Sequence, residues 1–381
     1  MSEFVTVVNV ESLSFTGTTW INTILGSHEN AFTLGPPQRA WEMTEGSDAC
    51  RIHGKDCEFW PGFFDQWKKG EDNFFVSLSQ YGGKDYIITN NPVPGQSAEE
   101  LNDPRVIVKR IRLIRDGRAL AASYARHYPE KGFHAGLSEF LNPAFSQFEF
   151  DPQNTEILSL RYEDILADKQ GTLDRCGDFV GLDYEPKALR FWEWEHHASA
   201  GNHGLFALIK FGQGIDVQNF EGKEFYEQQF KRSLEDEGDK FQDQRWMSEL
   251  SRGQLFLFDL CFGDDNARYG YDRDAFSVQE FRDYLAEVRA GVGSGSLSPF
   301  VAERLASSGL GDLAPIPVHG GGVSMPVAGA ANSNSLTFSQ KLKGKARGAA
   351  ALASRKFSAY PRLHGACRKA ARTLLRPLLS R

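Results

Sequence analysis

The stretch VTVVNVESLSFTGTTWINTIL, residues 5–25, decides the fold. Its first part is rich in Val and is bounded by polar residues, which is typical of a buried β-strand over Val5–Val10. The small polar segment Thr16–Thr19 follows, and from Trp20 onward the apolar residues recur at the spacing of a helix. The order of strand, tight loop and helix predicts the first unit of an α/β domain.

Two further segments repeat this pattern. The apolar run Val106–Ile114 predicts a strand, an Asp-Gly turn follows it, and the Ala-rich segment Arg118–His127 predicts a helix. Ile157–Leu160 predicts a third strand before a helix near Gly171–Val180. The fold class is therefore α/β, with a central, mostly parallel sheet flanked by helices. We expect the helix-rich residues 186–290 to pack on that sheet.

Length and composition set the domain organisation. The chain has 381 residues, of which 41% are hydrophobic and 24% are charged, and this excludes disorder throughout. From about residue 290 the composition changes to Gly, Ser, Ala and Pro. We predict an α/β domain over 1–290, a flexible, disordered linker over 291–340 and a basic tail over 341–381. The five scattered cysteines fit no disulfide framework and favour a reducing, cytoplasmic location.

Charge is distributed unevenly along the chain. Residues 313–381 hold 12 of the 43 Lys and Arg residues and none of the 50 Asp and Glu residues. The acidic body argues against general nucleic-acid binding. Two interpretations of the tail stay open: a solubilising disordered segment, or an amphipathic helix in peripheral contact with an anionic membrane surface. No run of apolar residues suggests a membrane span, and the first thirty residues lack the pattern of a secretory signal.

The loop at Thr16–Thr19 has the composition of an anion site. The N-terminus of a helix presents unpaired N–H groups, Gly17 lets the backbone approach an anion, and three hydroxyls can donate to its oxygens. The nucleotide-triphosphatase loop requires Gly where this chain has Ser12 and Lys where it has Thr18, so an ATP-dependent kinase is disfavoured. An ordinary capped helix remains the alternative interpretation.

A second anion site is predicted after the Val106–Ile114 strand. Arg115 follows that strand, and Ser123 lies eight residues on, in the next helix. Ligands of open α/β sheets bind at the carboxyl ends of the strands, where a guanidinium and a hydroxyl suit a phosphate. The alternative is that Arg115 forms a structural ion pair with Asp116 and that Ser123 is an ordinary helix residue.

Six segments together resemble sulfotransferases that use 3'-phosphoadenosine 5'-phosphosulfate (PAPS), in particular bacterial members. SFTGTTWINTILGSH (14–28) resembles their 5'-phosphosulfate loop, and IRLIRDGRALAASYAR (111–126) resembles their 3'-phosphate segment. SLRYEDILADKQGTLDRCGDFVGL (159–182) resembles the Tyr-Glu-Asp segment and its helix. HHASAGNHG (196–204) with FQDQRWMSELS (241–251) and ARYGYDR (267–273) resemble later elements of the family. The order of the six segments is more specific than any one of them.

The resemblance implies the P-loop-like sulfotransferase architecture and a transferase activity. Such an enzyme transfers a sulfuryl group from the co-substrate PAPS to a hydroxyl acceptor (glycan, lipid or small molecule), releases adenosine 3',5'-bisphosphate (PAP) and requires no metal. A non-catalytic PAP- or PAPS-binding scaffold that retains the fold is the alternative. The residues that the resemblance places on the nucleotide are Thr16, Gly17, Thr18, Thr19, Trp20, Arg115, Ser123, Tyr162 and Asn202. A core role for Tyr162 is equally open.

Two positions depart from the family pattern. Phe15 stands where members usually carry the basic residue that stabilises charge on the leaving oxygen, a role that an aromatic ring cannot perform. Candidate substitutes are Arg39, Lys109 and Arg112. Pro36 stands where many members carry the glutamate that deprotonates the acceptor. The nearest replacements as catalytic base are Glu42 and His28.

One further cluster carries metal-ligand residue types. Cys50, His53 and Cys57 have the spacing of zinc ligands, but the sequence shows no obvious fourth. Structural zinc, a local disulfide and unliganded cysteines stay open, and no metal ligand is assigned. His196 and His197 are adjacent, so their side chains point apart and are not expected to share a metal. The segment CEFW (57–60) resembles part of the acceptor wall of bacterial sulfotransferases.

Overall fold

The computed structural model describes residues 3–41, 50–67, 72–90, 96–220, 222–235, 243–308 and 310. All of them belong to one compact unit, Met1–Val327. The second unit, Ala328–Arg381, lies outside the described residues. So do all residues beyond 310, which include the predicted tail and most of the predicted linker.

A five-stranded sheet forms the centre of the unit and confirms the predicted α/β class. The strands lie in the order β2-β3-β1-β4-β5, and every neighbouring pair is parallel. Their bounds are β1 Val5–Ser12, β2 Ala31–Gly35, β3 Tyr86–Asn90, β4 Val106–Ile114 and β5 Ile157–Arg161. β1, β4 and β5 coincide with the three predicted strands, extended by one or two residues where they differ.

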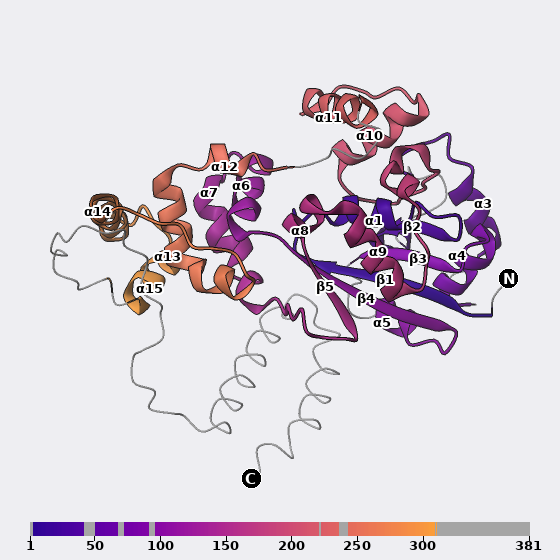
Figure 1. Ribbon diagram of the computed structural model, residues 1–381, viewed down its shortest axis with the longest axis horizontal. Coiled ribbons are helices and arrows are strands. Elements are labelled where there is room, and N and C mark those ends of the chain that lie inside the picture. Colours follow the sequence, from indigo (N-terminus) through magenta and orange to yellow (C-terminus); the bar gives the residue numbers. More distant parts are fainter. Residues whose placement is uncertain are drawn as a thin grey trace, which may run out of the picture. The chain divides into compact units, whose positions relative to one another are not determined.

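Helices connect and cover the strands (Figure 1). Those in the first two thirds of the chain are α1 Thr18–Leu25, α2 Pro37–Trp41, α3 Phe59–Gln66, α4 Phe74–Gly82, α5 Gln96–Leu101, α6 Gly117–His127, α7 Gly132–Ala135, η1 Gly136–Leu141, η2 Phe145–Gln147, α8 Tyr162–Ala167, α9 Lys169–Val180, η3 Pro186–Leu189, η4 Phe191–Glu193, α10 His203–Gln213 and α11 Lys223–Glu235. The remainder are α12 Trp246–Glu249, α13 Arg252–Arg268, α14 Val278–Ser294 and α15 Pro299–Ser307.

The sheet core explains why β1 and α1 form where they do. Val5, Val7, Val8 and Val10 are buried, because β1 is the central strand and is covered on both faces. α1 packs its apolar residues against β1, β2 and β3 and so returns the chain to the amino-terminal edge of the sheet. The loop between β1 and α1 is thereby held at the carboxyl-terminal edge.

Strand order places a crevice between β1 and β4. The chain leaves β1 toward β2, whereas it leaves β4 toward β5, so the connections diverge at these two adjacent strands. Such a topological switch point is where open α/β sheets bind their ligands. The loop 13–17 and the residue Arg115 follow the two strands that flank this crevice.

A second hydrophobic core corrects the expectation that residues 186–290 all pack on the sheet. α13 and α14 bury Phe256, Phe258 and Phe281 against Leu120 of α6 and against one another. Figure 1 shows α6, α7, α12 and α13 gathered together. The helices also continue past residue 290, where a linker was expected, because α15 buries Val301 in this same core.

No helix in the described part of the chain is both long and apolar enough to cross a membrane.

Candidate functional site

Gly17 shapes the loop between β1 and α1. It is the N-cap of α1 and has a left-handed backbone, with φ 94° and ψ 17°. A Cβ on Gly17 would lie 2.8 Å from the ring of Tyr162, so the loop backbone rests directly on that ring. Both the positive φ and the close approach favour glycine. The predicted role of Gly17 as the residue that brings backbone to the anion therefore has a structural basis.

The hydroxyls of the loop hold its shape. The Thr16 hydroxyl is buried and donates to the Leu13 carbonyl at 2.7 Å, while Thr18 shares a hydrogen bond with the Ser12 hydroxyl. The Thr19 hydroxyl accepts from the backbone N–H of Asn202 at 3.1 Å. The loop is therefore fixed before any ligand binds, and the first N–H groups of α1 point out of its end.

Arg115 joins this loop to β5 and α8. Its guanidinium donates to the Phe15 carbonyl at 3.0 Å and lies 4.4 Å above the centre of the Tyr162 ring. The residue is 4% exposed, and its Nε has no hydrogen-bond partner. The structure describes no Arg115–Asp116 ion pair: Asp116 caps α6 and pairs with Arg118 at 2.6 Å. Arg115 is thus a buried cation that the structural-pair alternative does not explain.

Three arginines, Arg115 among them, surround the carboxylate of Asp243. Asp243 Oδ2 lies 3.8 Å from Arg115 and 3.3 Å from Arg126, and Asp243 Oδ1 lies 2.8 Å from Arg245. Arg126 also donates to the Ser123 hydroxyl at 3.0 Å. The backbone N–H of Asp243 donates to the Tyr162 hydroxyl at 3.1 Å. The structure therefore brings Arg115, Ser123 and Tyr162 together around the carboxylate of Asp243.

The positive charges of the arginines keep the Asp243 carboxylate ionised. Burial alone raises the pKa of Asp243, but the Arg245 hydrogen bond and the charges of Arg115 and Arg126 lower it to about 2. Sequence reasoning missed Asp243, Arg126 and Arg245. The motif FQDQRWMSELS contains two of them, but nothing in their spacing indicates that they reach across 117 residues or more to Arg126 and Arg115.

The other residues predicted on the nucleotide have structural partners. Trp20 and Tyr162 are buried and pack edge to face, 5.6 Å apart. The Asn202 side chain caps α10, where its Oδ1 accepts from the Leu205 N–H at 2.9 Å. Trp20 and Tyr162 therefore support the loop from beneath, and Asn202 fastens the start of α10 to Thr19.

Glu163 and Tyr271 connect two more of the sequence motifs behind the site. The Tyr271 hydroxyl donates to Glu163 at 2.6 Å, and Glu163 accepts from the Asp116 N–H at 3.3 Å. Burial raises the pKa of Glu163. Arg161 donates to the Gly270 carbonyl at 2.9 Å, close to this contact. The end of α13 is thereby tied to the carboxyl ends of β4 and β5.

Of the two predicted catalytic bases, His28 lies within the described residues and Glu42 does not. His28 follows the C-terminus of α1, and its carbonyl accepts from Ala31 at the start of β2. It therefore lies at the amino-terminal edge of the sheet, opposite the loop, because α1 runs antiparallel to β1; this placement corrects the prediction for His28. Glu42 lies outside the described residues, directly after α2, which follows the carboxyl end of β2.

Phe15 contributes to the second core rather than to charge stabilisation. Its ring packs against Tyr124, His127 and Phe140, with centroids 6.4, 5.6 and 5.5 Å away, and its φ is 66°. The three substitute cations are placed as follows: Arg112 pairs with Glu11 and Glu149, Lys109 lies 5.3 Å from the Phe179 ring centre, and Arg39 is exposed on α2. Arg115 is the cation that contacts the loop backbone.

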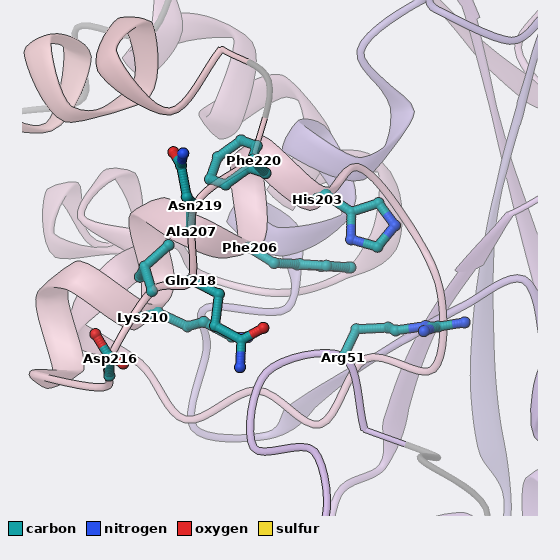
Figure 2. A pocket seen from close by; sticks show the side chains of 10 residues that line it. Arg51, His203, Phe206, Ala207, Lys210, Asp216, Gln218, Asn219 and Phe220 are labelled. Atoms are coloured by element: carbon teal, nitrogen blue, oxygen red, sulfur yellow. The ribbon is translucent and has the colours of Figure 1, made fainter.

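A cavity of about 320 Å³ lies beside α10 (Figure 2). Figure 2 shows Phe206, Ala207 and Lys210 on that helix, with Arg51 on a separate segment and its side chain extending away from Ala207 and Lys210. The cavity begins at His203, the residue that follows Asn202, and its remaining lining comes from residues 216–220. It is therefore adjacent in sequence to the contact between Asn202 and Thr19.

Comparison with known proteins gives structural similarity only. No family model matches the sequence, and no curated protein matches it. The sulfotransferase domain of the Synechococcus PCC 7002 olefin synthase is 16% identical, with a TM-score of 0.40 over 62% of this chain and 96% of that one. The sulfotransferase domain of the curacin biosynthetic pathway is 15% identical, with a TM-score of 0.33 over 61% and 99%. Mouse sulfotransferase SULT7A1 in complex with PAP is 12% identical, with a TM-score of 0.36 over 70% and 85%. These solved structures that the chain resembles are all sulfotransferases.

Proposed function

We propose that this chain transfers a sulfuryl group from PAPS to a hydroxyl acceptor. The observation that carries the proposal is the cluster of Arg115, Arg126 and Arg245 beside Ser123, in which Arg115 is buried, at the switch point that the Gly17 loop also borders. Two anion sites on adjacent strands suit a nucleotide with phosphate groups at both its 3' and 5' positions. The three arginines and Ser123 would hold the 3'-phosphate, and the loop would hold the 5'-phosphosulfate.

The reaction is an in-line displacement at sulfur. The acceptor oxygen forms a bond to sulfur while the bond from sulfur to the 5'-phosphate oxygen breaks, which yields a sulfate ester and PAP. The N–H groups at the start of α1 would donate to the oxygen on which charge develops.

We assign Glu42 as the catalytic base that removes the proton of the acceptor hydroxyl. It follows α2, which starts two residues after β2 ends, and β2 ends at the edge of the sheet that carries the loop. In the proposed reaction the Glu42 carboxylate would take the proton from the acceptor hydroxyl as the oxygen attacks. The cavity between α10 and Arg51 is the place proposed for the acceptor, since it begins next to the residue that contacts Thr19.

Transfer of radiolabelled sulfate from PAPS to a panel of phenols, alcohols, sugars and lipid headgroups tests the activity. We expect a labelled ester with the wild type and its loss in Arg115→Ala and in Glu42→Gln. His28→Gln is the matched control, and it should keep the activity because His28 lies at the other edge of the sheet. Retention of full activity in Arg115→Ala would overturn the assignment.

A scaffold that binds PAP without catalysis is the second candidate, and the packing of Phe15 favours it. In that case PAP binds, but no acceptor in the panel is labelled. Phe15→Lys separates the two functions. If the protein is a scaffold, Phe15→Lys should change the PAP affinity by less than about twofold. If it is a catalyst, Phe15→Lys should change the rate of sulfuryl transfer.

A further inference from the structure

The structure supplies the fourth ligand that the Cys50-x2-His53-x3-Cys57 spacing lacks. Cys50, His53, Cys57 and His197 each contribute one ligand atom, and these four atoms all lie within 4.8 Å of one another. Cys50 Sγ is 3.4 Å from His53 Nδ1, and Cys57 Sγ is 3.5 Å from His197 Nδ1. His196 points the other way and contacts the Phe191 carbonyl, as adjacent histidines were expected to do.

The two sulfur–nitrogen distances match a tetrahedral centre. Bonds of about 2.3 Å to sulfur and about 2.0 Å to nitrogen place tetrahedral ligand atoms roughly 3.3–3.8 Å apart. The two sulfur–nitrogen distances of 3.4 and 3.5 Å fall in that range. Two thiolates and two imidazoles are a ligand set typical of Zn²⁺.

A carboxylate behind the cluster orients both imidazoles. Glu195 Oε1 lies 3.3 Å from His53 Nε2 and 3.4 Å from His197 Nε2. With the carboxylate this close, each Nε2 is the nitrogen that would carry the proton, which would leave each Nδ1 lone pair for the metal. A carboxylate that accepts from ligand histidines is the usual outer partner of a zinc site.

Packing fixes the cluster from the other sides. His197 stacks on Phe59 with ring centres 4.6 Å apart, and its carbonyl accepts from Trp60 Nε1 at 2.7 Å. The backbone N–H of His53 points at Cys50 Sγ, 3.4 Å away. Both cysteines are buried and neither is in a disulfide.

We propose that Cys50, His53, Cys57 and His197 bind one structural zinc ion. Binding forms two zinc–sulfur and two zinc–nitrogen bonds, and the two thiol protons pass to the solvent. Four protein ligands leave no open position, so the ion stabilises the fold and takes no part in catalysis. It would join residues 50–57 to the segment that leads from His197 to Asn202, and would thereby hold Arg51 at the cavity of Figure 2.

Metal analysis of the full chain, purified without a histidine tag, tests the site. We expect about one zinc per wild-type chain, and less than about one tenth of that in Cys57→Ser and in His197→Gln. Cys261→Ser is the matched control, because Cys261 is equally buried but lies in the second core. It should keep its zinc.

Two measurements keep the proposal testable if ligand variants fail to fold. Glu195→Gln changes a mostly exposed side chain, and chelator competition should show zinc affinity about 10- to 100-fold weaker. Cobalt added to the chelated wild type should give the absorption of a tetrahedral thiolate complex. A metal-free wild type that gives no such absorption, or a native Cys50–Cys57 disulfide in the isolated chain, would overturn the proposal. Zinc content does not depend on nucleotide binding, so each proposal can fail without the other.

Discussion

The carboxylate of Asp243 lies 3.8 Å from the guanidinium of Arg115, in the place proposed for the 3'-phosphate of the nucleotide. Both groups are shielded from water, and Asp243 also contacts Arg126 and Arg245. A bound phosphate and this carboxylate would compete for the same three cations. If the nucleotide binds as proposed, Asp243 would hold the three arginines together beforehand, and the 3'-phosphate would have to displace it.

Asp243→Asn should therefore tighten PAP binding. The variant removes the competing charge but keeps the shape of the side chain, and we expect a dissociation constant about 3- to 10-fold lower. Asp183→Asn removes one negative charge from an exposed position and serves as the control. Calorimetric titration of both variants checks the prediction. Weaker binding in Asp243→Asn would mean that the carboxylate positions the arginines for the phosphate instead of competing with it.

Gly17→Ala should destabilise the loop and weaken PAP binding. The new methyl group would lie 2.8 Å from the Tyr162 ring in a backbone with a positive φ, so the loop must move away from Arg115. We expect a stability loss of about 1–3 kcal/mol and at least about tenfold weaker binding. Gly83→Ala is the matched control, because Gly83 has φ 62° but open space around it. Equal effects of the two substitutions on PAP affinity would exclude a role for the Tyr162 contact.

Asp259 gives a prediction about pH. It is buried in α13, burial raises its pKa to about 6, and its Oδ2 has no hydrogen-bond partner. The folded state therefore binds this proton more tightly than the unfolded state, and stability falls as pH rises from about 4 to about 6. Asp259→Asn should stabilise the protein by about 3 kcal/mol at pH 7.5, which lies above this range, and much less at pH 4.5.

Thermal melting at the two pH values measures this effect. Asp264→Asn, whose carboxylate pairs with Arg273 nearer the surface, is the control and should not show the same rise at pH 7.5. A melting temperature of Asp259→Asn that is unchanged or lower at pH 7.5 would show that ionised Asp259 is compensated in the folded state.

The sequence was sufficient for the strand–loop–helix units but not for the whole sheet. β1, β4 and β5 were predicted because each precedes a clear turn and a periodic helix. β2 and β3 are five-residue apolar runs, AFTLG and YIITN, which periodicity alone cannot distinguish from buried helix segments. The second core was also missed, because apolar spacing identifies a buried face without identifying its partner.

The site was predicted where one segment carries the pattern and missed where distant segments meet. Gly17 lies in the short loop after β1, and Arg115 directly follows β4, so topology places them at the crevice. Asp243 and His197 reach their clusters only through tertiary packing, His197 from 140 residues beyond Cys57. The His28 prediction relied on nearness in sequence to the loop, but an eight-residue helix of about 12 Å separates the two.

The most direct test of the proposed nucleotide site is calorimetric titration of the wild type and of Arg115→Ala with PAP and with adenosine 5'-monophosphate, which lacks the 3'-phosphate. Hydrogen bonds to a charged group contribute about 1.5–3 kcal/mol, so PAP should bind the wild type about 10- to 100-fold more tightly than the monophosphate. Arg115→Ala should remove most of that difference. Equal affinity of the wild type for the two nucleotides would contradict a 3'-phosphate site at Arg115.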